Sequence, residues 1–272
     1  MVQWTDYKSN RQHSVVGNLL QTSAVHSPEL GNARDLLVWL PYSYDGTRRY
    51  PVLYMHDGYN LFDDYTSFSG EWRVDETMTQ LAEEGIEAIV VGIPNNEQRM
   101  AEYSPFTDTR FRMKQSSGDA YLRFLAQTVK PLIDEDFHTI PDPWATGIAG
   151  SSMGGLISLY GYLRYPQVFG FAAALSPSYW FAGGRILETV ERIGAPHGRL
   201  YLDIGGKEGR NGSAYMRGVR RLADLLRAKG YNDDNFLYVE DPQGQHNEQS
   251  WARRLPAALR FLLLPLMQGI TS

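Results

Sequence analysis

The sequence predicts an α/β fold in which a mostly parallel central sheet is covered by helices on both faces. Two observations lead to this prediction. Short apolar runs alternate along the chain with segments of helical period, and parallel strands need such crossover connections. The 272 residues, 43% of them hydrophobic, are enough to bury one large core. No internal repeat or long linker divides the chain, so we expect a single domain over residues 1–272.

The first half of the chain contains four apolar runs typical of strands: VVGNLLQTSAV, RDLLVWLPYSY, YPVLYMHDG and IEAIVVGIP. Between the last two, VDETMTQLAEEG has helical period and ends at a glycine. A polar segment over residues 95–118 follows, and residues 119–137 then have the pattern of a helix.

The second half repeats the alternation of strand and helix. Predicted strands are WATGIAG, FGFAAALSP, RLYLDIGG and NFLYVED. Predicted helices run from about Met153 to Tyr165 and over YMRGVRRLADLLRAKG and NEQSWARRLPAALRFLLL. Ligands of such sheets bind at the carboxyl ends of the strands, so the loops at that edge are the place to look for a site.

Composition excludes several classes of function. The net charge is −5 and the basic residues are scattered, which argues against a nucleic-acid partner. The chain has no cysteine, so thiol catalysis and cysteine-ligated zinc are excluded. The polar N-terminus lacks the apolar region of a secretion signal, and FLLLPLM is too short to span a bilayer; we therefore expect a cytoplasmic protein without a membrane partner.

No motif indicates a metal or a cofactor. The sequence contains no H-E-x-x-H, no paired histidines and no EF-hand loop. The glycines of GGKEGRNG lack the Lys-Ser/Thr of a P-loop and the order of a dinucleotide-binding turn. We expect neither a nucleotide nor a catalytic metal.

A serine lies at the centre of the turn between strand WATGIAG and the next helix. Residues 150–154 match G-x-S-x-G, a turn that holds its middle serine in a strained conformation with the hydroxyl projecting from the sheet. Ser152 is therefore the candidate nucleophile, and Ser151 is expected to be a packing or hydrogen-bonding neighbour. A glycine-rich turn with a serine N-cap is the alternative, but the strand before and the helix after it favour the nucleophile.

A serine hydroxyl needs a base to accept its proton and a carboxylate to orient that base. In this type of turn both follow the serine along the chain. The histidines after Ser152 are His197 and His246. His197 precedes a predicted strand and thus lies at the amino edge of the sheet, whereas His246 follows the last strand and lies at the carboxyl edge. We therefore predict His246 as the base.

Two carboxylates are candidates for the acid. Glu208 lies just past the strand RLYLDIGG, on the same edge as the serine and the histidine, and is preferred. Asp241, at the end of the last strand, remains the alternative. The other acidic residues considered lie within a strand, on the polar face of a helix or in a turn at the opposite edge: Asp203, Asp224, Asp233 and Asp234.

An oxyanion in this chemistry needs preorganised N–H donors. The N–H of Met153, at the start of the helix after the serine, can supply one. The second is expected from the loop MHDGYN, either from Gly58 or, as the alternative, from Tyr59. The same HDG triplet is also an ordinary turn signal.

Several segments resemble the putative esterase family of α/β-hydrolases, which includes enterochelin esterases, esterase D, feruloyl esterase domains and antigen 85 mycolyltransferases. The resemblance extends over nearly the whole chain and is greatest to enterochelin esterase-like and esterase D-like hydrolases. Its segments are VWLPYSYDG, PVLYMHDGYNLFD, EYSPF, GIAGSSMGGLISLYGYLRYPQVFG, LSPSYWF, LYLDIGGKEG and HNEQSWARRLPAALRFLL. The resemblance implies an α/β-hydrolase fold and a triad of Ser152, Glu208 and His246.

Taken together, these features predict a serine carboxylic ester hydrolase that acts through an acyl-enzyme on small acyl, carbohydrate-linked or siderophore-type esters. An acyltransferase on the same scaffold and a non-catalytic binding protein remain alternatives. Tyr59 and Trp180 are predicted to line the substrate pocket, although core packing accounts equally well for any one aromatic residue. Further aromatic candidates are Phe62, Phe181 and Trp251. Arg99, Glu102 and Tyr103 are predicted to form a structural salt bridge under a loop.

Overall fold

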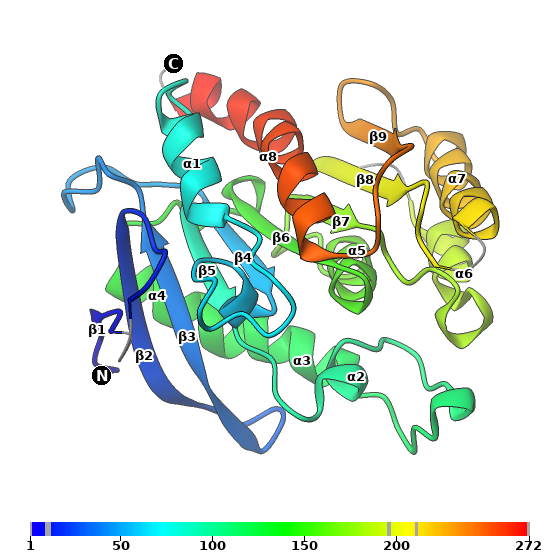
Figure 1. Cartoon of the computed structure of the whole chain (residues 1–272), viewed down its shortest axis with the longest axis horizontal. Coiled ribbons are helices and arrows are strands. Elements are labelled where there is room, and N and C mark those ends of the chain that lie inside the picture. Colours follow the sequence, from blue (N-terminus) through cyan, green and yellow to red (C-terminus); the bar gives the residue numbers. More distant parts are fainter. Residues whose placement is uncertain (1, 9–11, 195–196, 210–211, 271–272) are drawn as a thin grey trace.

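A computed structural model describes residues 2–8, 12–194, 197–209 and 212–270. Within these residues, one sheet contains nine strands in the order β1-β2-β3-β5-β4-β6-β7-β8-β9 (Figure 1). The strands are β1 (Thr5–Asp6), β2 (Asn18–Ser27), β3 (Asn32–Leu40), β4 (Val52–His56), β5 (Ile89–Ile93), β6 (Thr146–Ser151), β7 (Phe171–Leu175), β8 (Arg199–Gly205) and β9 (Phe236–Asp241). The first three strands pair antiparallel, as does β3 with β5, and all remaining pairs are parallel. The predicted fold class is confirmed.

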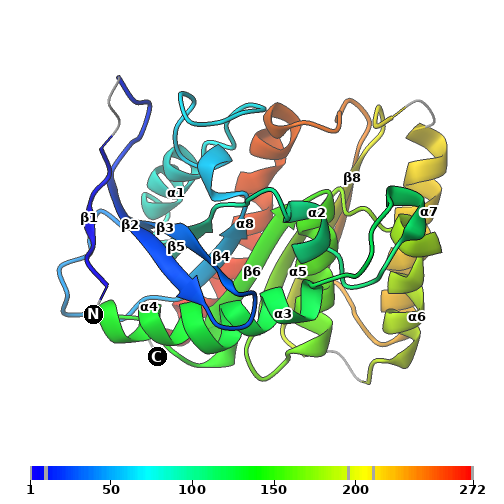
Figure 2. The same cartoon turned by 90° about the horizontal axis from the view of Figure 1, so that it is seen from below.

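Helices cover both faces of the sheet (Figures 1 and 2). They are α1 (Val74–Ala82), α2 (Arg99–Glu102), α3 (Gly118–Arg123), α4 (Lys130–Asp136), α5 (Met153–Arg164), α6 (Arg185–Arg192), α7 (Gly212–Ala228) and α8 (Glu248–Ile270). One apolar core lies between the sheet and α3 to α7, and a second lies under α1 and α8. Strands β4 to β7 are buried along their whole length, as their continuous apolar runs predict for strands covered on both faces.

The parallel strands place six loops at one edge of the sheet. Strands β4 to β9 run in the same direction, so the segments after His56, Ile93, Ser151, Leu175, Gly205 and Asp241 all emerge at their carboxyl ends. Every candidate site residue follows one of these strands, because the alternation of strands and helices returns the chain to this edge each time.

Some elements were not expected from the sequence. Strand β1 and helices α2 and α6 are short, so they give little periodic signal. The helix predicted over residues 119–137 is present, but its middle third, Phe124–Val129, is wound as a π-helix. None of the helices in the described ranges is both long enough and apolar enough to cross a membrane.

Candidate active site

The backbone at Ser152 adopts the strained conformation that the G-x-S-x-G pattern predicts. Ser152 has φ 56° and ψ −119° and lies between β6 and α5. Its N–H donates to Leu175 O at 3.0 Å, and its carbonyl accepts from Ser178 N at 2.9 Å. A Cβ on Gly150 would lie 2.8 Å from the ring of His56. Only glycine fits there, so the pattern of small residues reflects close packing around the serine.

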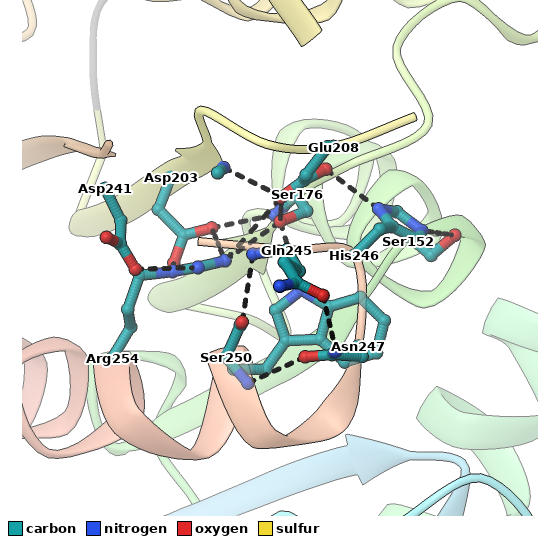
Figure 3. A network of polar contacts seen from close by, with 12 residues as sticks. Ser152, Ser176, Asp203, Glu208, Asp241, Gln245, His246, Asn247, Ser250 and Arg254 are labelled. Carbon is teal, nitrogen blue, oxygen red and sulfur yellow. Dashed lines mark hydrogen bonds and ion pairs between the residues drawn. The ribbon is translucent and has the colours of Figure 1, made fainter. Parts of the chain in front are cut away.

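The structure brings Ser152, His246 and Glu208 together (Figure 3). His246 Nε2 lies 2.9 Å from Ser152 Oγ, and His246 Nδ1 lies 2.8 Å from Glu208 Oε2. The histidine comes from the loop between β9 and α8, and the glutamate from the loop after β8. The side chain of His246 is 35% exposed and that of Glu208 only 1%. A ligand can therefore reach the serine and the imidazole, while the carboxylate is shielded.

Asp241, the alternative acid, points elsewhere. Its carboxylate accepts from Arg253 at 2.5 Å and from Arg254 at 3.4 Å. Although burial disfavours its charged form, the hydrogen bond from Arg253 lowers the pKa of Asp241 below its ordinary value. Asp241 is thus held in an ion-pair network on the far side of Arg254 from the histidine (Figure 3).

Met153 and Gly58, the predicted oxyanion donors, both occupy the first position of a helical turn. Met153 begins α5, and Gly58 begins a short 3₁₀ turn over Gly58–Asn60. The N–H groups at the start of a helix have no partner within the helix, so both are available to a ligand. A Cβ on Gly58 would lie 2.7 Å from Pro94 N, which makes glycine necessary at this position.

The residue before Gly58 is fixed by an ion pair. Asp57 has φ 57°, and its carboxylate accepts two hydrogen bonds from Arg99, at 2.7 and 2.8 Å. Its N–H donates to Tyr103 Oη at 3.1 Å, and Arg99 lies over the Tyr103 ring. Glu102 forms a buried ion pair with Arg34 at 2.8 Å. Residues 99–103 therefore have the structural role that the sequence predicts, bracing the Gly58 loop.

A second histidine, His56, lies directly beneath the serine turn. It is 2% exposed, and its Nδ1 lies 2.7 Å from Tyr121 Oη. Burial lowers the pKa of His56 to about 3, so the ring is neutral at physiological pH. It packs against Gly150 and Gly154. The hydrogen-bond partners of Ser152 Oγ within the described residues are His246 and Ser178, not His56.

The aromatic candidates divide into two groups. Phe62, Phe181 and Trp251 are 1%, 1% and 5% exposed and belong to the core, which is the alternative that the sequence left open for each of them. Trp180 is partly exposed and contacts the rings of Phe111 and Tyr215 at 5.8 and 6.3 Å. Tyr59 is 36% exposed, and its hydroxyl donates to Asp35 Oδ2 at 2.7 Å, so the phenol is directed to β3.

Three residues close to the serine were not identified from the sequence. Ser178 Oγ lies 3.3 Å from Ser152 Oγ, and Ser176 and Arg254 lie behind Glu208. Ser176 and Ser178 follow β7 at the carboxyl edge, a signal that could have identified both. Arg254 lies within α8, where nothing in the sequence separates it from the neighbouring Arg253.

Comparison with known proteins identifies the family of this chain. A family model described as "Putative esterase" matches residues 27–262. The Bacillus subtilis (strain 168) protein YbbA is 27% identical over 241 residues, which cover 85% of this chain and 93% of YbbA. An endo-1,4-beta-xylanase/feruloyl esterase of Xylanibacter ruminicola is 26% identical over 242 residues, which cover 85% of this chain and 30% of that protein.

Solved structures share the fold. The BES protein from Bacillus cereus superposes with a TM-score of 0.73 at 20% identity, over 95% of this chain and 99% of that one. The enterobactin esterase FES from Shigella flexneri superposes with a TM-score of 0.70 at 20% identity, over 96% and 62%. The family match spans most of the residues, and this chain therefore belongs to the putative esterase family, carboxylic ester hydrolases with an α/β-hydrolase fold.

Proposed function

We propose that Ser152, His246 and Glu208 form a catalytic triad that hydrolyses carboxylic esters through an acyl-enzyme. The observation that supports this most strongly is the unbroken hydrogen-bonded chain between the three side chains, at 2.9 and 2.8 Å. The distances match those needed for a nucleophile, its base and the group that orients the base.

In the first half of the reaction, Ser152 Oγ attacks the ester carbonyl carbon while His246 Nε2 accepts the hydroxyl proton. The negative charge that develops on the carbonyl oxygen is stabilised by the N–H groups of Met153 and Gly58. The imidazolium then donates its proton to the alkoxy oxygen, the C–O bond breaks and the alcohol leaves. Glu208, accepting from Nδ1–H, stabilises the imidazolium during this step.

In the second half, His246 accepts a proton from water and the resulting hydroxide attacks the acyl carbon. The ester bond to Ser152 breaks, the proton returns to Ser152 Oγ, and a carboxylic acid is released. The exposure of His246 supports this step, since water can approach the acyl group directly.

The substrate class that we propose is small acyl, carbohydrate-linked or siderophore-type esters. Two of the similar proteins are named as a feruloyl esterase and an enterobactin esterase, which supports an ester that carries an aromatic acyl group. Trp180 lies two residues after Ser178, whose hydroxyl contacts Ser152. With Phe111 and Tyr215 it forms an aromatic cluster against which an aromatic ring of the substrate could pack.

Labelling with a fluorophosphonate tests the triad. The wild-type protein is expected to form one covalent adduct, located by peptide mass spectrometry on Ser152, and to hydrolyse p-nitrophenyl acetate. Ser152→Ala is expected to abolish the adduct and to lower kcat by about 10⁴ or more. Ser151→Ala, which alters the buried neighbouring hydroxyl, is the matched control and should label normally. A wild-type protein that takes no label would exclude the triad, and transfer of the acyl group to an added alcohol in place of water would identify an acyltransferase.

A further inference from the structure

Ser176 is the first residue after β7 and lies directly behind Glu208. It has φ 43°, a left-handed conformation that is strained for a residue other than glycine. Its N–H donates to Asp203 Oδ1 at 2.8 Å, and its hydroxyl contacts three side chains. Such strain persists where surrounding contacts enforce it, so these contacts are the place to look for a role.

The direction of the Ser176 hydroxyl proton follows from its partners. Trp251 Nε1 lies 3.0 Å from Ser176 Oγ, and Arg254 Nη2 lies 2.9 Å from it. An indole N–H and a guanidinium N–H can only donate. The hydroxyl accepts from both, so its single proton must be donated to the third partner, Glu208 Oε1, at 2.5 Å.

Glu208 therefore receives donors on both oxygens. Oε1 accepts from Ser176 Oγ and from Gly205 N at 2.7 Å, and Oε2 faces His246 Nδ1 at 2.8 Å. A carboxylate that is 1% exposed is stable only when its oxygens are satisfied in this way. Because Oε1 is occupied by two fixed donors, the carboxylate plane is fixed and Oε2 is left as an acceptor aimed at the histidine.

Behind Ser176, a buried ion pair holds the donors in place. Arg254 Nε lies 2.7 Å from Asp203 Oδ2 and Nη2 lies 3.1 Å from Oδ1, and the two side chains are 5% and 0% exposed. Asp203 thus binds both the Ser176 N–H and the guanidinium that contacts the Ser176 hydroxyl. Arg254 Nη2 also lies 3.9 Å from Glu208 Oε1, so a positive charge lies close to the buried carboxylate.

We propose that Ser176 and Arg254 are positioning residues for the triad, which orient Glu208 through the polarised Ser176 hydroxyl and so keep the His246 proton on Nδ1 and the bare Nε2 toward Ser152. Figure 3 shows the line of contacts from Asp203 and Arg254 through Ser176 and Glu208 to His246 and Ser152. This inference rests on the proposed triad. Trp251 supports it from the other side, since the Trp251 ring meets the His246 ring edge-on at 5.1 Å.

The charged and titratable groups near Glu208 come from four segments. They are His246 from the loop before α8, Arg254 from α8, Asp203 and Tyr201 from β8, and Asp241 from the end of β9. Lys207, although adjacent in sequence, bonds Gln243. Among the residues that the structure describes, Arg254 is the cation that forms an ion pair with Glu208 within 4 Å, apart from His246 itself.

Two Ser176 variants test the proposal. Ser176→Ala removes the hydroxyl and retains the strained backbone, and Ser176→Gly removes both the hydroxyl and the strain. Each is expected to lower kcat/KM by about 10- to 100-fold, the worth of a hydrogen bond to a charged group, mainly through kcat. The acid limb of the kcat/KM profile should move to higher pH in both, because a lost donor favours protonated forms of the Glu208–His246 pair. Ser158→Ala, which removes a buried hydroxyl bonded to Gly154 O, is the matched control and should leave the profile unchanged.

A spectroscopic measurement separates positioning from stability. In the wild-type protein, ¹⁵N NMR of the His246 ring should report a single tautomer with the proton on Nδ1, and the Ser176 variants should report a mixture. This readout needs no turnover, so it still tests the inference if the wild-type serine fails to take a fluorophosphonate and the proposed function is wrong. The proposal would be overturned if both Ser176 variants kept the wild-type tautomer of His246 and the wild-type pH profile of kcat/KM. This holds even if their activity fell because they were less stable.

Arg254 is tested by comparison with its neighbour. Arg254→Lys keeps a cation, and Arg254→Met removes it and leaves Asp203 buried without its partner. The acid limb should move further for Arg254→Met than for Arg254→Lys. Arg253→Met removes the ion pair between Arg253 and Asp241. This variant should leave the acid limb at its wild-type pH. If Arg254→Met does not fold, the Ser176 variants decide the matter, since they keep the Arg254–Asp203 pair intact.

Discussion

His246 and Glu208 share a hydrogen bond of 2.8 Å, although Asp241 ends the strand next to the one that Glu208 follows. Asp241, in β9, pairs with Gly205, in β8. Gly205 lies three residues before Glu208 in the sequence. The two carboxylates therefore emerge at the same edge, but the guanidinium groups of Arg253 and Arg254 bind Asp241 and leave Glu208 to the histidine.

This relationship predicts different results for two isosteric variants. Glu208→Gln should lower kcat by about 10³ to 10⁴, because an amide can donate to Nδ1 and favours the wrong tautomer of His246. Asp241→Asn should lower kcat by less than about tenfold, since it weakens only a partly exposed ion pair. Steady-state kinetics with p-nitrophenyl acetate measure both. A larger loss for Asp241→Asn than for Glu208→Gln would assign the acid to Asp241.

The ion pair of Arg99 with Asp57 leads to a prediction for the loop that carries Gly58. Arg99→Met removes two hydrogen bonds to Asp57, whose backbone at φ 57° is held by them. The Gly58 N–H would then be less well fixed, and kcat should fall by about 10-fold or more while KM changes little, since one whole oxyanion donor is worth about 10² to 10³.

The control for Arg99 is Arg73→Met. Arg73 also has an acidic partner, Glu76, but the Arg73 side chain is 64% exposed at the residue before α1. The Arg73→Met variant should keep the wild-type kcat. An Arg99→Met protein that keeps kcat and loses only thermal stability would show that the Gly58 N–H does not depend on this ion pair.

Trp180 leads to a prediction about substrate size. Its ring is partly exposed beside Phe111 and Tyr215, two residues after Ser178. Trp180→Ala should raise KM for aromatic and long-chain acyl esters by about tenfold, the scale of lost aromatic contact, and should change KM for acetate esters much less. Trp144→Ala, at an exposed tryptophan before the start of β6, serves as the control. Equal changes for short and long esters would remove Trp180 from the acyl pocket.

Much of this arrangement can be predicted from sequence because it depends on local patterns. The strands that carry Ser152, Glu208 and His246 are short apolar runs, and parallel order places the residue after each run at one edge. The glycines at 150 and 155 belong to the local G-x-S-x-G pattern and its extension. A Cβ on Gly150 would lie 2.8 Å from the His56 ring, and a Cβ on Gly155 would lie 2.8 Å from Leu175 O.

What could not be predicted depends on how distant elements are rotated against one another. Trp251 and Arg254 are one turn apart on α8, and only the docking of α8 on β7 and β8 turns both toward Ser176. The same docking buries Trp251, for which the sequence left a pocket and the core equally open. Asp203 was set aside because it lies inside a strand, yet its burial is what allows it to hold Arg254.

Three acidic side chains gather at the start of α1. Ligand oxygens of Glu71, Asp75 and Glu76 lie within 4.8 Å of one another. Asp75 is fully buried, and its Oδ2 accepts from Val16 N at 2.6 Å while Oδ1 has no hydrogen-bond partner among the described residues. Burial, followed by the proximity of Glu76, raises the pKa of Asp75 well above its ordinary value, and burial also raises the pKa of Glu71 to about 7.

This cluster should make the protein less stable as the pH rises. Below about pH 4 the carboxyl groups are protonated in both the folded and the unfolded chain, so they add no pH dependence. Between that value and the raised pKa of the folded state, the folded chain binds more protons than the unfolded chain. The free energy of unfolding therefore falls as the pH rises through this window, and becomes level again above it.

Asp75→Asn isolates this contribution. The amide oxygen of the new Asn side chain can still accept from Val16 N–H. The amide is neutral at every pH, so it does not need to take up a proton when it is buried. Relative to wild type, the variant should gain at least about 1.4 kcal/mol of unfolding free energy between pH 5 and pH 8, the equivalent of one pKa unit. Urea unfolding at the two pH values measures the gain, with Asp224→Asn, on an exposed side chain of α7, as the control. If the unfolding free energy of the variant differed from that of the wild type by the same amount at pH 5 and at pH 8, Asp75 would be ionised in the folded protein at both pH values, and the prediction would be wrong.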